Sequence, residues 1–240
     1  MKNATTLPAT LARELHLADG DVLLIDKPKG WTSFDVVHRV RRLFRVKKAG
    51  HAGTLDPLAT GLLIVCTGRM TRETGRFMAA EKEYLVGMRL GARTPSFDAE
   101  TPVCETRSTD DVTDDRIRAA LAGFLGTRRQ VPPMWSAVKV HGERLYRYAQ
   151  RGQEVPRPAR EVTIQAIIPV RIAIPDVEMT VVCSKGTYIR SLVDDIGGAL
   201  GCGAFVSALR RTRIGAYAVE DAATMEDLVR YAQEAGVQTV

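Results

Sequence analysis

Apolar residues along the chain alternate between strand-like and helix-like spacing without a regular strand–helix order. Short apolar runs at 22–25 and 62–65 predict buried strands, and the alternation over 84–90 predicts a half-buried strand. Two further strands are expected at about 162–170 and 179–183. The irregular succession of elements favours an antiparallel arrangement over repeated βαβ units.

Helix starts are marked by threonines that precede apolar residues at helical spacing. Thr32 and Asp35 have the spacing of a capping box and precede a segment whose apolar and basic residues would lie on opposite sides of a helix. Further helices are expected from about Thr113, with a C-terminal cap at Gly126, from Thr187 and at Thr224. The fold class predicted is α/β, of the α+β type, with a mixed and mainly antiparallel sheet flanked by helices and loops.

Two segments stand apart in composition. Residues 98–115 carry seven acids against one arginine, and the simplest interpretation is a solvated connection that leads into a helix. Residues 128–160 carry eight Lys and Arg against two Glu, interleaved with aromatic residues and punctuated by Pro and Gly. This second segment predicts a long basic loop containing a short helix, and loops of this length usually bind ligands or move.

The chain's charge is concentrated near its N-terminus. Its 240 residues include 34 Lys and Arg and 28 Asp and Glu, which gives a net charge of +6. Residues 26–48 alone contain eight Lys and Arg against two Asp, so they account for the whole excess. A concentrated basic segment favours a polyanionic partner such as nucleic acid.

Several classes of protein are disfavoured by what the sequence lacks. The four cysteines are too widely spaced for a zinc ribbon or a redox pair, and the four histidines form no metal-binding pattern. No phosphate-binding glycine loop of standard spacing and no apolar run of membrane-spanning length occurs. We therefore expect a cytoplasmic protein with reduced thiols, no metal, no cofactor and no membrane partner.

A glycine-rich loop at residues 50–63 holds one carboxylate, Asp56, beside the basic segment. Asp56 precedes Pro57, and an Asp-Pro pair most often only starts a turn. A carboxylate next to a polycationic surface could also act as a nucleophile or base on a bound polyanion. Composition alone does not choose between these interpretations.

Five motifs, in the same order along the chain, resemble the TruB family of tRNA pseudouridine-55 synthases. Their order and their span over most of residues 22–213 make the resemblance specific, although each motif alone is weak. The motifs are Leu24 to Ser33, Gly50 to Leu63 around Leu55-Asp56-Pro57, Lys82-Glu83-Tyr84, Gln130 to Pro133 with Ser136 to Lys139, and Cys183 to Arg190.

The resemblance implies the pseudouridine synthase fold and a cofactor-independent isomerisation of one uridine in the T-loop of tRNA. Asp56 matches the family's catalytic aspartate. The reaction breaks the N-glycosidic bond and re-forms it as a C-glycosidic bond to the same ribose. Whether the carboxylate attacks the sugar, attacks the base or removes a ribose proton stays open.

The same resemblance suggests residues that bind the substrate. Tyr84 would stack on the target base, Arg190 would pair with the catalytic aspartate through charge-assisted hydrogen bonds, and Leu209 would line the base pocket. His51 would fill the space left by the extruded nucleotide. Lys27, in the loop after the first strand, is also assigned to substrate binding.

Extrusion of the uridine costs a few kcal/mol, whereas one stacked aromatic ring returns only about 1–3 kcal/mol, so phosphate contacts must contribute. The candidates for these contacts are the basic loop at 128–160 and the cations of the basic segment. Those cations are Arg41, Arg42, Arg45, Lys47 and Lys48.

We expect an N-terminal segment at 1–21, a catalytic domain at 22–213 and a short tail at 214–240, too short for the PUA-like domain of longer relatives. Ser96 and Thr101 depart from the family's more usual Thr and Gly, and Trp135 from its usual Tyr or Phe. Alternative functions are an RNA-binding protein or tRNA folding chaperone, and a guide-directed synthase acting on other RNA. No obligatory protein partner is expected.

Overall fold

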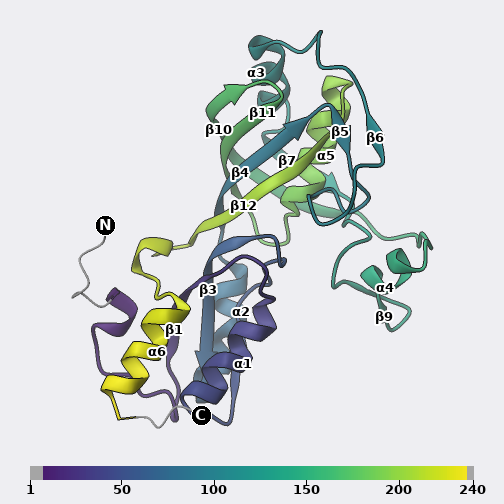
Figure 1. Cartoon of the computed structure of the whole chain (residues 1–240). Coiled ribbons are helices and arrows are strands. Elements are labelled where there is room, and N and C mark those ends of the chain that lie inside the picture. The colour runs from purple at the N-terminus through teal and green to yellow at the C-terminus, as the bar shows by residue number, and fades with distance from the viewer. Residues whose placement is uncertain (1–7, 237–240) are drawn as a thin grey trace. The chain divides into compact units, whose positions relative to one another are not determined.

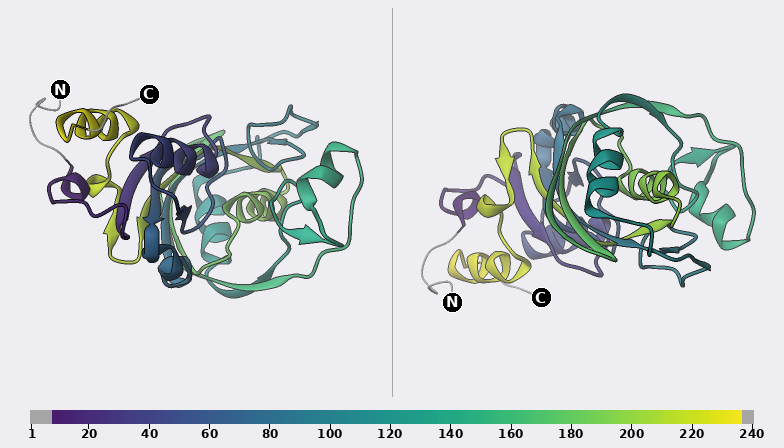
Figure 2. Two further views of the ribbon diagram at one scale, coloured as in Figure 1. Left: turned by 90° about the horizontal axis from the view of Figure 1, so that it is seen from below. Right: turned by 90° about the horizontal axis from the view of Figure 1, so that it is seen from above.

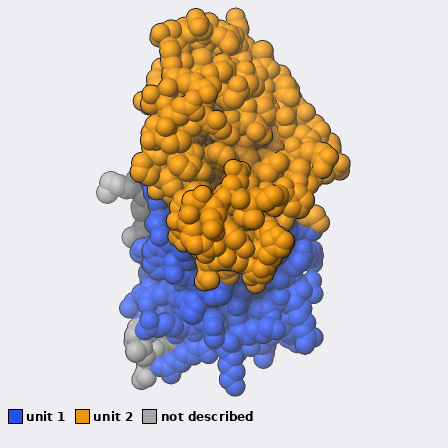
Figure 3. Space-filling model, turned by 90° about the vertical axis from the view of Figure 1, so that its right-hand side faces the viewer, with its two compact units in different colours: residues 1–83, 210–240 blue, residues 84–209 orange. Residues whose placement is uncertain are grey.

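The computed structural model describes residues 8–236 and divides into two compact units. Unit 1 comprises residues 1–83 and 210–240, and unit 2 comprises residues 84–209 (Figure 3). The chain leaves unit 1 within strand β4 (Lys82–Leu90) and returns to it within strand β12 (Ala204–Ile214) (Figure 1). Both strands therefore contribute residues to both units.

The sheet of unit 1 is built around a fully buried central strand. Strand β3 (Thr60–Thr67) pairs antiparallel with β1 (Val22–Lys27) and with β2 (Ala49–His51), and parallel with the C-terminal part of β12. A short strand, β13 (Tyr217–Ala218), forms a hairpin with the end of β12. Because β3 is covered on both faces, its sequence is a continuous apolar run instead of an alternating one. The strands expected at 22–25 and 62–65 are confirmed.

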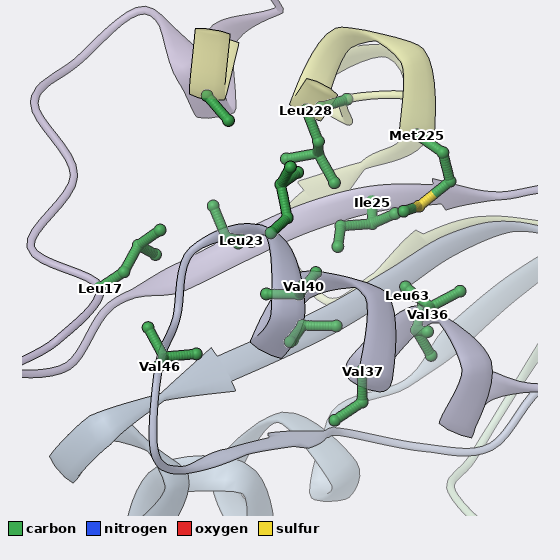
Figure 4. Packing of buried hydrophobic residues seen from close by; sticks show 14 of the residues in the cluster. Leu17, Leu23, Ile25, Val36, Val37, Val40, Val46, Leu63, Met225 and Leu228 are labelled. Atoms are coloured by element: carbon green, nitrogen blue, oxygen red, sulfur yellow. The ribbon is translucent and has the colours of Figure 1, made fainter. Parts of the chain in front are cut away.

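Helix α1 (Ser33–Leu43) begins where the sequence predicts. Thr32 accepts the backbone N–H of Asp35, and the Asp35 carboxylate accepts the backbone N–H of Thr32, which completes the predicted capping box. Val36, Val37 and Val40 pack into the core of unit 1 (Figure 4), so the helix presents its basic residues to solvent.

The core of unit 1 includes residues near both ends of the chain. Leu17 precedes β1, and Leu228 belongs to α6 (Met225–Glu234); both pack into the cluster that contains Leu23 and Val40 (Figure 4). The sequence predicts that residues 214–240 form a tail outside the catalytic domain. In the structure, Met225, Leu228 and Ala232 of α6 are part of the core of unit 1.

Short helical segments complete unit 1. They are the 3-10 helices at Ala9–Leu11, Gly68–Glu73 and Val219–Asp221 and the helix α2 (Thr74–Ala79).

The sheet of unit 2 has the strand order β12, β4, β11 (Asp176–Cys183), β10 (Arg160–Ala173) and β7 (Gly126–Gln130). Strand β10 pairs antiparallel with both β11 and β7. Buried and more exposed positions alternate along β4 and β11, as in a sheet with one covered face. The mixed, mainly antiparallel sheet predicted from the sequence is confirmed.

Helices α3 (Asp114–Ala122) and α5 (Ile189–Leu200) pack against each other on one face of this sheet (Figures 1 and 2). Both predicted helices are confirmed, and α5 ends as expected at Gly201, whose φ of 83° suits glycine. The predicted cap of α3 at Gly126 is wrong. The helix ends at Gly123, and Gly126 begins β7.

The basic loop predicted at 128–160 contains some regular secondary structure. It contains the predicted short helix, α4 (Leu145–Gln150), preceded by a hairpin of β8 (Lys139–Val140) and β9 (Glu143–Arg144). The first and last basic residues of the segment belong instead to β7 and β10. A second small hairpin pairs β5 (Ala92–Arg93) with β6 (Glu105–Thr106).

The four cysteines are free thiols, and burial raises the pKa of Cys66 to about 11. Within residues 8–236, no helix has the length and apolar character required to span a bilayer.

Candidate active site

Asp56 lies in the loop that connects β2 to β3 in unit 1, and its side chain is half-buried. The backbone carbonyl of Asp56 accepts the N–H of Ala59 at 3.1 Å, which closes a turn within the loop. The carbonyl of Pro57 accepts the N–H of Gly30 at 2.8 Å. The glycine loop is therefore joined to the loop that follows β1.

Ser33 holds the residue immediately before Asp56. Its buried hydroxyl accepts the backbone N–H of Leu55 at 2.8 Å and lies 3.1 Å from the Leu55 carbonyl oxygen, to which it donates. Both polar groups of the Leu55 peptide backbone are thus satisfied by one side chain 22 residues away. No pattern in the sequence points to this contact.

Arg211, in β12, holds the two ends of the same loop. Its Nε donates to the carbonyl of Leu62 at 2.7 Å, and its guanidinium NH2 group donates to the carbonyl of Gly53 at 3.1 Å. The side chain is almost completely buried. Gly53 has a φ of 101°, a conformation that residues with a Cβ rarely adopt. The loop that carries Asp56 is therefore fixed by a charged residue and by a glycine-specific backbone conformation.

His51 ends β2, at the start of the glycine loop, and is half-buried. Desolvation, together with the positive charge of Arg211, lowers the pKa of His51 below its usual value of 6.5. Both causes favour the neutral imidazole over the charged one. The His51 ring lies edge-on to Phe34, with 6.4 Å between centroids.

Lys27 is fully buried at the end of β1. Its ammonium donates to the carbonyls of Pro28 at 3.0 Å and of Trp31 at 2.6 Å, so it stabilises the loop that leads into α1. The preceding residue, Asp26, forms a two-bonded ion pair with Arg210, at 2.9 and 2.7 Å. Substrate binding by Lys27 stays a prediction.

The remaining predicted pocket residues lie in unit 2. Tyr84 is in β4 and Leu209 is in β12, and both side chains are buried. Arg190 is the second residue of α5 and is 4% exposed. Its expected pairing with Asp56 stays a prediction.

Within unit 2, Arg190 belongs to a buried polar network. It donates to the carbonyls of Ser96 at 3.0 Å and of Trp135 at 2.8 Å, and it lies 3.4 Å from the carboxylate of Asp98. The hydroxyl of Ser96 bonds to both Asp98 and Thr101. Two residues that depart from the family pattern, Ser96 and Trp135, therefore contact the predicted active-site arginine through their backbone carbonyls.

The burial of Asp98 corrects the interpretation of the acidic segment. Asp98 is 1% exposed and pairs with Arg190, so it is not part of a solvated connection. Later acids of the segment, such as Asp110 and Asp114, are exposed, as expected for a solvated connection. A count of acids could not separate Asp98 from these residues, because its partner is 92 positions away in the sequence.

The predicted phosphate-binding cations all lie at the surface of unit 1. Arg41 and Arg42 are exposed on the last turn of α1, and Arg45 follows the helix with a φ of 52°. Lys47 and Lys48 are exposed just before β2. Residues 8–236 contain no group of three or more His, Cys, Asp or Glu side chains able to hold a metal ion.

Two family models together match most of the chain. The model of the N-terminal domain of TruB family pseudouridylate synthases matches residues 41–189, which is more than half of the sequence. The chain belongs to the TruB family. A second model, of the tRNA pseudouridylate synthase B C-terminal domain, matches residues 190–239.

Curated TruB relatives are similar over most of this chain. The tRNA pseudouridine synthase B of Burkholderia pseudomallei strain 668 is 53% identical over 209 residues, which are 86% of this chain and 68% of the relative. The enzyme of the same name from Ralstonia nicotianae is 51% identical over 220 residues, 90% of this chain and 68% of the relative. The chain thus spans about two thirds of the length of these relatives.

Solved structures show the same fold. A Cbf5-Nop10-Gar1 complex contains a chain that is 33% identical with a TM-score of 0.71, and the match covers 97% of this chain and 61% of that one. An H/ACA RNP bound to a substrate RNA containing 2'-deoxyuridine contains a chain that is 30% identical with a TM-score of 0.69, covering 99% and 63%.

Proposed function

We propose that the protein isomerises a uridine in the T-loop of tRNA, at position 55, to pseudouridine, with Asp56 as its catalytic residue. The observation that carries the proposal is the TruB family membership, together with a carboxylate in the glycine loop at the family's catalytic position. The bond between the ribose C1' and the base N1 breaks, a bond from C1' to C5 forms, the C5 proton leaves and N1 gains a proton, so that substrate and product are isomers. The reaction is redox-neutral and requires no cofactor.

The structure of unit 1 supports a positioning role for the loop. Asp56 is held between Leu55, whose backbone is bonded by Ser33, and Pro57, whose carbonyl is bonded by Gly30. A group that reacts with a bound nucleotide gains from such pre-organisation, because the backbone that carries the carboxylate is held in place before the substrate arrives. Tyr84 and Leu209 are proposed to contact the extruded base, and Arg190 is proposed to pair with Asp56.

The proposed partner is the T-arm of tRNA, and the proposed location is the cytoplasm. The exposed cations of α1 and of the segment that follows it suit a phosphate backbone. A relative's structure contains a substrate RNA, which is consistent with an RNA substrate for this fold.

The test is the conversion of uridine in a T-arm stem-loop by the wild-type protein and by Asp56→Asn. We expect Asp56→Asn to bind the RNA but to form no detectable pseudouridine, because the amide can act neither as a nucleophile nor as a base. Asp110→Asn, at an exposed acid of unit 2, is the matched control and should be fully active. Wild-type activity in Asp56→Asn would contradict the assignment. RNA refolding without pseudouridine formation by the wild type would favour a chaperone instead.

A further inference from the structure

The solvent-facing side of α1 carries an ordered row of side chains that begins beside the glycine loop. Residues three or four positions apart on a helix are neighbours, so Phe34, His38 and Arg42 form one continuous stripe. Val36, Val37 and Val40 occupy the opposite, buried side (Figure 4). Packing of the core therefore does not determine which residues occupy the stripe.

The first member of the stripe, Phe34, is an exposed aromatic residue. It is 62% exposed, more than the other large apolar side chains exposed in residues 8–236. The Phe34 ring lies 5.5 Å from the His38 ring and 6.4 Å from the His51 ring, centroid to centroid. An exposed phenyl ring therefore neighbours both the predicted nucleotide-displacing histidine, His51, and His38 of the helix.

The surroundings of the stripe are positively charged. A surface depression of about 410 Å³ beside it is lined by Trp31, His38, Arg39 and Arg42, together with Gly30 and Asp35. The acid among these residues, Asp35, accepts hydrogen bonds from the N–H and the hydroxyl of Thr32, and these bonds lower its pKa. This carboxylate caps the helix, while the guanidinium groups face the depression.

We propose that Phe34 is a base-stacking residue for the RNA substrate: a nucleobase close to the isomerised uridine stacks on its ring, and His38 and Arg42 contact the phosphates that follow. This inference rests on the proposed function and adds a residue that the motifs did not identify. An aromatic ring beside cations is the arrangement that binds unpaired nucleotides, because bases supply a π-face and the backbone supplies charge. An apolar protein partner fits less well, since its surface would bury the adjacent guanidinium groups without compensation.

The proposal also addresses the energy of base extrusion. One stacked ring does not cover the cost of unstacking and unpairing a loop nucleotide. Phe34 would supply a second ring in unit 1, separate from Tyr84 in unit 2, and would hold a neighbouring base that has lost its stacking partner.

The test measures the dissociation constant of a T-arm stem-loop at several salt concentrations, with pseudouridine formation followed in parallel. Phe34→Ala should weaken binding on the order of 5- to 150-fold, the range for removal of one stacked base. Phe34→Trp should retain wild-type affinity, whereas Phe34→Leu, apolar but not aromatic, should behave like the alanine variant. Met78→Ala removes another exposed apolar side chain of unit 1 and should change nothing.

Salt dependence distinguishes stacking from charge. A stacked base releases no counterions, so Phe34→Ala should leave the slope of log affinity against log salt unchanged, while Arg42→Gln should lower it by up to about 0.7–0.9. Wild-type affinity in Phe34→Ala, or equally weakened binding in Phe34→Ala and Phe34→Trp, overturns the stacking role while the wild type still forms pseudouridine. If the wild type forms none, the proposed function fails and this inference fails with it.

Discussion

The loop that carries the proposed catalytic carboxylate is positioned by side-chain contacts that the motifs do not predict. Ser33 bonds both backbone groups of Leu55, and Arg211 bonds the carbonyls at the two ends of the loop. Asp56 itself can be identified from the sequence because its neighbours form a recognisable motif. The supporting contacts cannot, because they join residues 22 and about 150 positions apart.

Ser33→Ala should reduce pseudouridine formation more than it reduces RNA binding. The substitution leaves the buried N–H and C=O of Leu55 without their partner, which costs about 1–3 kcal/mol of stability and loosens the backbone next to Asp56. Single-turnover rates, RNA affinity and urea unfolding would be measured on the same preparation.

Thr10→Ala provides the control for this variant. The Thr10 hydroxyl also accepts a buried backbone N–H in unit 1, that of Leu24, which does not belong to the glycine loop. This control variant should be destabilised to a comparable extent and keep its single-turnover rate. Equal reductions of the rate in the two variants would show that Ser33 contributes only to stability.

At the scale of elements, the sequence predicts a helix best where a capping motif is followed by apolar residues at helical spacing. Helix α1 is expected because Thr32 and Asp35 precede apolar residues at helical spacing, and the structure confirms both features. The predicted cap at Gly126 is wrong because the helix ends three residues earlier, at Gly123. Gly126, which has a positive φ, is instead the first residue of strand β7. Strand β12 is not expected, since Arg210, Arg211 and Arg213 interrupt the apolar alternation. Of these three arginines only Arg211 is buried, and its partners Leu62 and Gly53 lie far away in the sequence.

Helix α6 gives a direct test of where unit 1 ends. Leu228 is fully buried against residues of β1 and α1, so Leu228→Ala should destabilise the protein by about 2–5 kcal/mol. Gln233→Ala, on the exposed side of the same helix, should change the free energy of unfolding by no more than about 0.5 kcal/mol. Chemical denaturation measures both. A small effect for Leu228→Ala would mean that α6 contributes little to the stability of unit 1, as for a tail outside the catalytic domain.

At the scale of the whole molecule, the placement of charge matters more than its amount. The net charge of +6 equals the excess carried by residues 26–48, and the structure exposes Arg41, Arg42 and Arg45 of this segment at one end of α1. Attraction between a basic patch and RNA phosphates depends on local charge density, because screening shortens the range of electrostatic interactions to about 8–10 Å at physiological salt. Net charge alone therefore does not predict RNA affinity.

Two triple variants with the same net charge distinguish the effect of local charge density from the effect of net charge. Replacing Arg41, Arg42 and Arg45 by Gln should weaken tRNA binding and lower its salt slope by up to about 0.7–0.9 for each phosphate that is no longer neutralised. Replacing Arg72, Arg118 and Arg171 by Gln, at positions exposed in other parts of the chain, removes the same charge. This control should lower affinity only slightly and leave the slope unchanged, because these arginines neutralise no phosphate of the bound RNA. Equal slopes in the two variants would place the RNA-binding surface outside the basic segment, even if pseudouridine formation by the wild type is confirmed.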